Sequence, residues 1–277
     1  SDAFKMPEKI SFAKLRLSAS GVGSGGTDPY LTSFNYTSAG SLFGGALQNP
    51  SSLANPDLKP LKTITFETGL NIAFFQNRLT LDLALYNGNT KNQILSRIID
   101  RASGFSTATV NIGKVNNKGI EVTMSAVPVQ TKSFKWTASL NYSSNSNTIQ
   151  ELADSNVVLY RGPQGGTQII AKPGGSLGDL YGIGFERAPD GQVVYNASTG
   201  VAELSPDIQY LGNTTPKGRI GLGNKFSFKR FGLNILFDAQ FGAVGYSLTH
   251  YKLSEQGKTT NTLPGRYNGI IGNGVIE

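Results

Sequence analysis

A strict alternation of apolar and polar residues constrains the fold of this chain more than any other feature. Between residues 63 and 75, apolar side chains occupy alternate positions, with Thr, Glu, Gly and Asn between them: Ile64, Phe66, Leu70, Ile72 and Phe74. Successive side chains of a β-strand point to opposite faces, so a period of two predicts a strand with one apolar and one polar face. The same alternation predicts strands at 13–19, 63–75, 78–86, 118–127, 134–142, 219–228 and 233–241.

The connections between these strands alternate between short and long. Short turns are expected at 76–77, 128–133 and 229–231, and long segments rich in Gly, Asn, Ser, Thr and Pro lie at 21–62, 88–117 and 146–216. In an antiparallel arrangement, all the short turns lie at one end and all the long loops at the other. Two-faced strands of about 9 to 11 residues with this asymmetry are typical of a transmembrane β-barrel. The sequence therefore predicts an all-β fold, an antiparallel portion of such a barrel with about seven or more strands, short periplasmic turns and long extracellular loops.

The low content of charged residues is consistent with strands that face lipid. Only 16% of the residues are charged, whereas a soluble domain has about 25%, and a Lys or Arg facing lipid at the middle of the membrane costs about 2 to 4 kcal/mol. A soluble antiparallel sandwich also alternates, but the asymmetry of the connections favours the barrel. Aromatic residues gather toward the short turns, as in the girdle at a membrane interface: Phe74, Phe75, Phe134, Trp136, Phe226, Phe228 and Phe231.

The composition also narrows the chemistry. The chain has no Cys and a single His, His250, which removes thiol nucleophiles, disulfides and most zinc and triad sites. The net charge is +7, yet Lys and Arg are scattered singly and do not interleave with aromatic residues, so nucleic acid is not an expected partner. No cofactor is expected, although acidic residues of the 146–216 segment leave loop calcium as an option: Asp179, Glu186, Asp190, Glu203 and Asp207.

Short motifs spread along the chain resemble one family. They include Asn55-Pro56-Asp57-Leu58-Lys59-Pro60 before a strand, Asn111-Ile112-Gly113-Lys114-Val115-Asn116-Asn117-Lys118-Gly119, and Gly212-Asn213-Thr214-Thr215-Pro216. Together they resemble the SusC/RagA family of TonB-dependent outer-membrane transporters of Bacteroidetes. The resemblance covers nearly the whole chain.

This resemblance implies a place in the bacterial outer membrane and a part in the energised import of oligosaccharides or oligopeptides, without enzymatic activity. Members of the family are longer chains with a plug domain, a TonB box and a 22-stranded barrel. Residues 1–277 are therefore expected to be a segment of the barrel domain, without the plug, the TonB box and the final strands. The implied partners are a SusD-like surface lipoprotein over the mouth, TonB acting through the N-terminal part, the oligosaccharide or peptide cargo, and outer-membrane lipid.

The candidate ligand-contacting residues are aromatic and amide side chains of the long loops, which can stack on sugar rings and hydrogen-bond to hydroxyls. They are Tyr30, Tyr36, Tyr160, Tyr181, Tyr195 and Asn213, and no catalytic, cofactor-binding or metal-binding residue is expected. Charged residues on the polar strand faces are expected to form ion pairs in the wall of the lumen: Lys14, Arg16, Glu67, Asp82, Glu121, Arg219 and Asp238.

Two other classes of function compete with this hypothesis. A secreted β-sandwich that binds glycans or acts as an adhesin would have polar outer faces and would need no detergent. A glycoside hydrolase on an all-β scaffold would need two carboxylates about 5 to 9.5 Å apart in a cleft.

Overall fold

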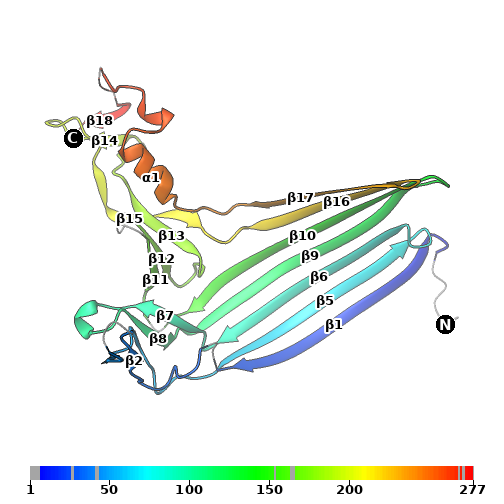
Figure 1. Ribbon diagram of the computed structural model, residues 1–277, viewed down its shortest axis with the longest axis horizontal. Coiled ribbons are helices and arrows are strands. Elements are labelled where there is room, and N and C mark those ends of the chain that lie inside the picture. Colours follow the sequence, from blue (N-terminus) through cyan, green and yellow to red (C-terminus); the bar gives the residue numbers. More distant parts are fainter. Residues whose placement is uncertain are drawn as a thin grey trace.

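The core of the architecture is a seven-stranded antiparallel sheet, in which each strand pairs with its neighbour in chain order (Figure 1). The computed structural model describes residues 7–25, 28–40, 44–152, 154–162, 166–267, 269 and 272–276. All seven predicted strands are confirmed, and each is longer than predicted. They are β1 (Ile10–Ser24), β5 (Leu61–Phe74), β6 (Leu79–Lys91), β9 (Lys114–Gln130), β10 (Phe134–Glu151), β16 (Gly218–Phe228) and β17 (Phe231–Phe241).

The extra length lies mainly at the end of the long connections, where the alternation fades. Strands β5 and β6 stay paired as far as Lys62 and Lys91, and β9 and β10 as far as Lys114 and Glu151. The ladder is formed by backbone groups, which pair whatever the side chains are. A strand inferred from hydropathy therefore ends where its apolar face ends, before its hydrogen bonds do.

The turns at the other end are short, as predicted, but differ in detail. Between β5 and β6 the two-residue turn expected at 76–77 is instead a loop in which Phe75, Gln76 and Asn77 all have positive φ, at 53°, 55° and 68°. Strand β9 continues through Pro128 to Gln130, with a bulge in its pairing to β10 between Ala126 and Val129. Proline has no N–H to give to the ladder, and a bulge is one of the few places where a strand tolerates it.

Pairing register gathers the apolar residues on one face of the sheet and the polar residues on the other. One row across all seven strands consists of Leu15, Leu70, Leu83, Val122, Tyr142, Ile220 and Ala239. The adjacent row, on the opposite face, consists of Lys14, Asn71, Asp82, Thr123, Asn141, Gly221 and Asp238.

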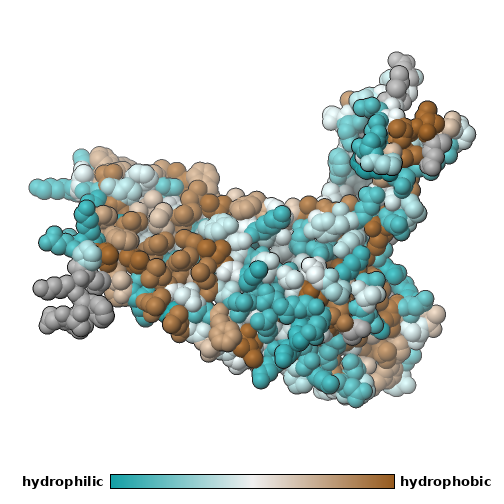
Figure 2. All heavy atoms as spheres, turned by 180° about the vertical axis from the view of Figure 1, so that it is seen from behind, coloured by the Kyte–Doolittle hydropathy of each residue, from teal (hydrophilic) through white to brown (hydrophobic). Residues whose placement is uncertain are grey.

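The apolar face is exposed. Leu17, Phe66 and Phe237 have 72%, 60% and 62% of their surface accessible, and Figure 2 shows apolar residues covering the half of the molecule that carries the short turns. Within the described part of the chain, no second sheet packs on this face. This arrangement fits a sheet that faces lipid and does not fit the sandwich alternative, whose apolar faces would be buried between two sheets.

Aromatic rings gather at the short-turn end of this face. Trp136 stacks on Phe226 at 5.8 Å between ring centroids, and Phe226 stacks on Phe134 at 6.4 Å. The indole N–H of Trp136 donates to Oδ1 of Asn224 at 3.1 Å, which gives this polar side chain a partner on an otherwise apolar face. The cluster is located where the sequence predicts the interfacial girdle.

The three long connections lie together at the opposite end of the sheet and contain strands of their own (Figure 1). The first carries β2 (Thr37–Ser38), β3 (Leu47–Gln48) and β4 (Ser52–Leu53), and the second carries β7 (Ile94–Ile98), the 3-10 helix η2 (Arg101–Ser103) and β8 (Thr107–Asn111). The third carries β11 (Val157–Arg161), β12 (Thr167–Ala171), β13 (Asp179–Phe185), β14 (Val193–Tyr195) and β15 (Leu204–Asn213). After β17 come α1 (Leu248–Glu255), the 3-10 helix η4 (Thr260–Thr262) and β18 (Gly274–Ile276).

These loop strands form small sheets. Four of them pair in the order β11-β12-β13-β15, β4 pairs with β8, which also pairs with β7, and β14 runs parallel to β18. No helix among the described residues has both the length and the apolar character needed to cross a membrane.

The buried core lies at this loop end. Val115 of β9 pairs with Ile149 of β10 on the polar side of the sheet, and both are fully buried. They pack with Ile112 and with Val157 and Ala171 of the third connection. The third connection is therefore fixed to the inner face of the wall by a hydrophobic core of the kind found in soluble proteins.

Candidate functional site

The inner wall carries an ion pair anchored by three side chains. Arg16 of β1 donates from Nη1 to Oδ2 of Asp82 at 2.9 Å and from Nη2 to Oδ1 at 2.7 Å, and Asn71 donates from Nδ2 to Oδ2 at 2.9 Å. This pair links β1 to β6 across β5, as the expected lumen-wall ion pairs would. Within the described residues the other candidates form no ion pair: Lys14, Glu67, Glu121, Arg219 and Asp238.

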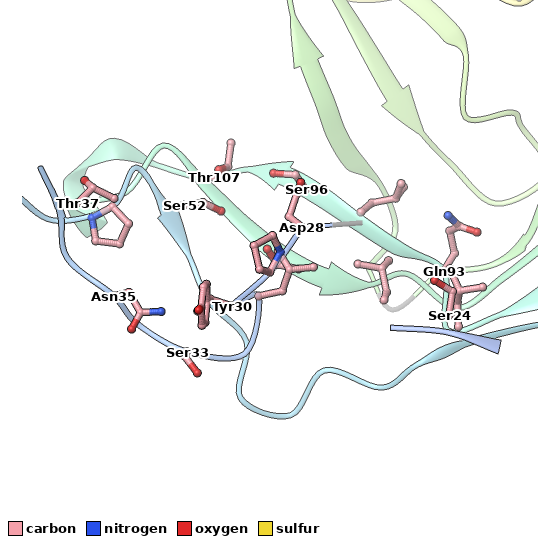
Figure 3. Close-up of a pocket in the computed structure, with 18 residues that line it drawn as sticks. Ser24, Asp28, Tyr30, Ser33, Asn35, Thr37, Ser52, Gln93, Ser96 and Thr107 are labelled. Carbon is pink, nitrogen blue, oxygen red and sulfur yellow. The ribbon is translucent and has the colours of Figure 1, made fainter. Parts of the chain in front are cut away.

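A first cavity of about 720 Å³ lies between the first and second long connections. Figure 3 shows Tyr30 and Asn35 from the first connection together with Ser96 of β7 and Thr107 of β8 around it. Ser24 and its register partner Leu61 also line the cavity, at positions whose alternation places them on the polar face of the sheet. The cavity therefore opens on the inner side of the wall.

Most polar groups around this first cavity are hydroxyls and amides, and among the described residues that line it Asp28 is the one ionisable side chain apart from the tyrosine. Tyr30 is 74% exposed, and its φ of 63° is unusual for a residue with a side chain. Backbone strain of this kind occurs at functional positions more often than elsewhere. Alternation along the strands could not reveal the contributions of Asp28, Asn35 and Gln93, because these residues lie outside the strands of the large sheet.

A second cavity of about 370 Å³ includes Asn213 and is lined by Asn147, Ser176, Tyr210 and Lys217 among others. The Asn213 amide is already engaged: Nδ2 donates to Oδ1 of Asp179 at 2.9 Å, and Oδ1 accepts from the backbone N–H of Thr215 at 2.7 Å. Asn213 therefore shapes this cavity mainly by holding the chain around it.

The other candidate tyrosines are distributed over separate parts of the loops. Tyr36 is exposed and packs edge-on against Phe34 at 5.6 Å, and Tyr160 is exposed on β11. Tyr195 lies on β14, which pairs with β18. Among the six candidates, the structure places Tyr30 at the first cavity and Asn213 at the second, and it does not bring the six together at one site.

Tyr181 lies on β13, half-buried against Tyr210 at 5.6 Å between centroids, with the Lys172 ammonium 4.2 Å from the centre of its ring. Burial, with smaller contributions from Asp179 and Tyr210, raises the pKa of the Tyr181 phenol above its usual value. Its ring face is occupied by a cation of the protein itself, so less of it is available for stacking.

A third cavity of about 640 Å³ lies at the tip of the second connection. Asp100 and Arg101 of this tip line it, and Arg161 reaches it from the end of β11 in the third connection. Thr107 lines both this cavity and the first one, so the two adjoin. Sequence patterns give no indication of the two arginines, which are separated in the chain by strands β9 and β10 and lie in different connections.

The family model described as "TonB dependent receptor-like, beta-barrel" matches residues 12–200, which run from the third residue of β1 to beyond β14. This chain belongs to the TonB-dependent receptors. Barrels of this family lie in the outer membrane, and its members are receptors and transporters, which also agrees with the expectation that the chain is not an enzyme.

Individual receptors agree with the family assignment. TonB-dependent receptor P3 of Formosa agariphila is 27% identical over 90% of this chain and 27% of its own length. TonB-dependent receptor SusC of Bacteroides thetaiotaomicron is 35% identical over 35% of this chain and 10% of its own length. In the solved structure of the RagAB peptide transporter, the similarity covers 87% of this chain and 28% of the matched chain, with a TM-score of 0.68 and 21% identity. The chain thus corresponds to about a quarter of the length of P3 and of the RagAB chain.

Several loop carboxylates that the structure describes accept hydrogen bonds from neighbouring residues of the loops. Among the described residues, no group of three or more His, Cys, Asp or Glu side chains is placed to hold a metal ion. Asp179 accepts from the Ser176 N–H and from Asn213, Asp190 from Gln192, and Glu203 from Asn196. These contacts give the acidic residues structural roles in turns and loop sheets.

Proposed function

We propose that this chain forms part of the wall and extracellular loops of a TonB-dependent importer that takes up oligosaccharides or oligopeptides. The observation that carries the proposal is the division of the sheet into a lipid-facing apolar side and a polar side, on which folded loops with hydroxyl- and amide-lined cavities are fixed. The structurally similar RagAB protein is a peptide transporter, which favours cargo of oligomeric size.

In this proposal the wall and the loop cavities have different roles. The polar row containing Arg16 and Asp82 lines the route through the barrel, and the loop cavities give cargo its first contacts at the mouth. Of the candidate residues, Tyr30 is the best placed to contact cargo, because its ring is exposed and it lines the first cavity. Tyr36 of the first connection and Tyr160 of the third are exposed, and we propose that they contact a long cargo molecule or the lid.

The proposal also includes the plug, the TonB box, TonB and a surface lipoprotein. We infer that residues 1–277 are one section of a longer receptor, with the plug and the TonB box elsewhere in it, and that TonB drives release of the plug. A SusD-like surface lipoprotein would cover the mouth over the long connections. Similarity to SusC and to the RagAB structure supports this assembly.

Uptake by cells tests the function. Cells that carry or lack the full-length receptor would be given fluorescent oligosaccharide and oligopeptide mixtures, with and without a protonophore that removes the energy source of TonB. We expect receptor-dependent uptake that stops with the protonophore. Uptake that is the same in both strains would refute the proposal, and a receptor purified without a stoichiometric surface lipoprotein would refute the lid.

A further inference from the structure

We propose that the third cavity binds an anionic group, a carboxylate or sulfate, carried by an oligosaccharide whose neutral part occupies the first cavity. The inference rests on the proposed function, because it specifies the kind of cargo that these loops recognise. It depends on three features of the described residues: two arginines without partners, their convergence in one cavity, and the residue Thr107 that this cavity shares with the first cavity, whose lining is of different polarity.

The two arginines are free to bind a ligand. Neither the Arg101 nor the Arg161 guanidinium has a hydrogen-bond or ion-pair partner among the residues that the structure describes, and both side chains are exposed. By contrast, Arg97 of the adjacent strand β7 is neutralised by an ion pair with Asp154. A guanidinium presents a fixed fork of donors that matches the oxygens of a carboxylate or sulfate, and such charge-assisted pairs are among the strongest polar contacts.

The local charge favours an anion. The described residues that line the cavity supply two cations, Arg101 and Arg161, and one carboxylate, Asp100. Oδ1 of Asp100 accepts from the backbone N–H of Ala102 at 2.8 Å, where it caps η2 and holds the tip of the connection in shape. The acid thus has a structural role and lies beyond ion-pair distance of either arginine. The hydroxyl of Ser106 is also used within the fold, donating to the Ser51 carbonyl at 2.9 Å.

The adjoining first cavity indicates what carries the charge. Thr107 is shared by the two cavities, and beyond it the lining changes to hydroxyls and amides with the exposed ring of Tyr30. Side chains of these types bind sugars by hydrogen bonds to hydroxyls and by contact of a ring with a sugar face. The first cavity opens on the polar side of the sheet, so an anion held beside it belongs to material entering the lumen and not to a lipid headgroup outside.

Binding to the full-length receptor in detergent tests the inference. The probes are tetragalacturonate, a sulfated galactose tetrasaccharide, neutral maltotetraose and the acidic peptide tetraglutamate, titrated by calorimetry at low and high salt. We expect one of the two acidic saccharides to bind more tightly than maltotetraose and to weaken as salt rises. Arg101→Gln and Arg161→Gln should each weaken that binding about tenfold or more, because each removes a charge-assisted hydrogen bond.

A matched control separates this local effect from a general loss of charge. Arg230 lies in the turn between β16 and β17 at the opposite end of the sheet. Arg230→Gln makes the same chemical change and should leave binding unaltered, and retained heat-modifiable mobility on a gel would show that all three variants are folded.

Several results would overturn the inference. They are equal binding of acidic and neutral saccharides, binding of neither acidic saccharide, full affinity in Arg161→Gln, or tighter binding of tetraglutamate than of either saccharide. The uptake experiment remains independent of these outcomes. Energised uptake that is unchanged in both arginine variants would refute this inference alone. Binding that depends on the arginines, without receptor-dependent uptake, would refute the proposed function alone.

Discussion

Replacing Val122 by lysine tests the assignment of the two faces of the sheet. Val122 lies on β9 between Leu83 and Tyr142, in the apolar row that crosses all seven strands. The next residue, Thr123, lies between Asp82 and Asn141 on the polar face and is exposed. The two positions are adjacent in sequence, but Val122 is predicted to face lipid and Thr123 to face the aqueous lumen. Each is therefore the control for the other.

The expected loss in free energy of unfolding follows from the depth of Val122 in the membrane. Its register partner Tyr142 stands six residues beyond Trp136 of the interfacial girdle along β10. At about 3.3 Å per residue and a strand tilt of about 40°, this is about 15 Å of depth, close to the middle of an apolar band about 25 Å tall. Lysine facing lipid at this depth costs about 2 to 4 kcal/mol, a change of about 30- to 900-fold in the folding equilibrium.

The assay is urea unfolding of the full-length receptor in lipid vesicles, followed by tryptophan fluorescence and by heat-modifiable mobility. Val122→Lys should lower the free energy of unfolding by about 2 to 4 kcal/mol, and Thr123→Lys should change it by about 0.5 kcal/mol or less. Equal losses in the two variants, or a larger loss in Thr123→Lys, would show that the faces have been assigned the wrong way round.

Three further predictions concern the wall and the loops. Asp82→Asn should destabilise the receptor by about 1 kcal/mol or less, since its pair with Arg16 is about one-third exposed. Urea titration at two salt concentrations should show a smaller loss of stability at high salt. An equal loss at both concentrations would exclude an ionic effect. Gly119→Ala should destabilise by about 1 to 3 kcal/mol, because an added Cβ would overlap the Tyr86 ring that lies against this glycine, and unchanged stability by the same titration would contradict that packing. The Tyr181 phenol should ionise at higher pH than the exposed tyrosines, because burial raises its pKa. The protonated form is favoured in the folded state, so stability should fall as pH rises above about 10. An absorbance difference between wild type and Tyr181→Phe that titrates at the ordinary tyrosine pKa would contradict this prediction.

The wall is predictable from the sequence because lipid imposes a rule on every second residue. The alternation of Leu79, Leu81, Leu83 and Leu85 is sufficient to locate β6 and its apolar face. The rule ends with the membrane, so hydropathy does not reveal the outer ends of β9 and β10. There, Val115 and Ile149 are apolar residues of the inner face, buried under a loop that an alternation rule does not anticipate.

The candidate site is predictable in residue type more than in position. Tyr30 is a loop aromatic of the kind expected to contact cargo, and it does line a cavity. Arg101 and Arg161 could not be selected, because they approach each other only after two connections have folded, and neither lies in a periodic or motif-bearing segment. A shared cavity formed by loops depends on tertiary packing, for which local sequence carries little signal.

The position of the buried core suggests how wall and loops are mechanically related. Apolar side chains of the strands face lipid, so their burial cannot order the loops. The loops are instead ordered by a separate cluster that joins Val115 and Ile149 of the wall to Val157 and Ala171 of the third connection. Closely packed interiors of this kind transmit displacement instead of absorbing it. Because Arg161 ends the strand that begins at Val157, a shift of β9 and β10 would also move one side of the arginine-lined cavity.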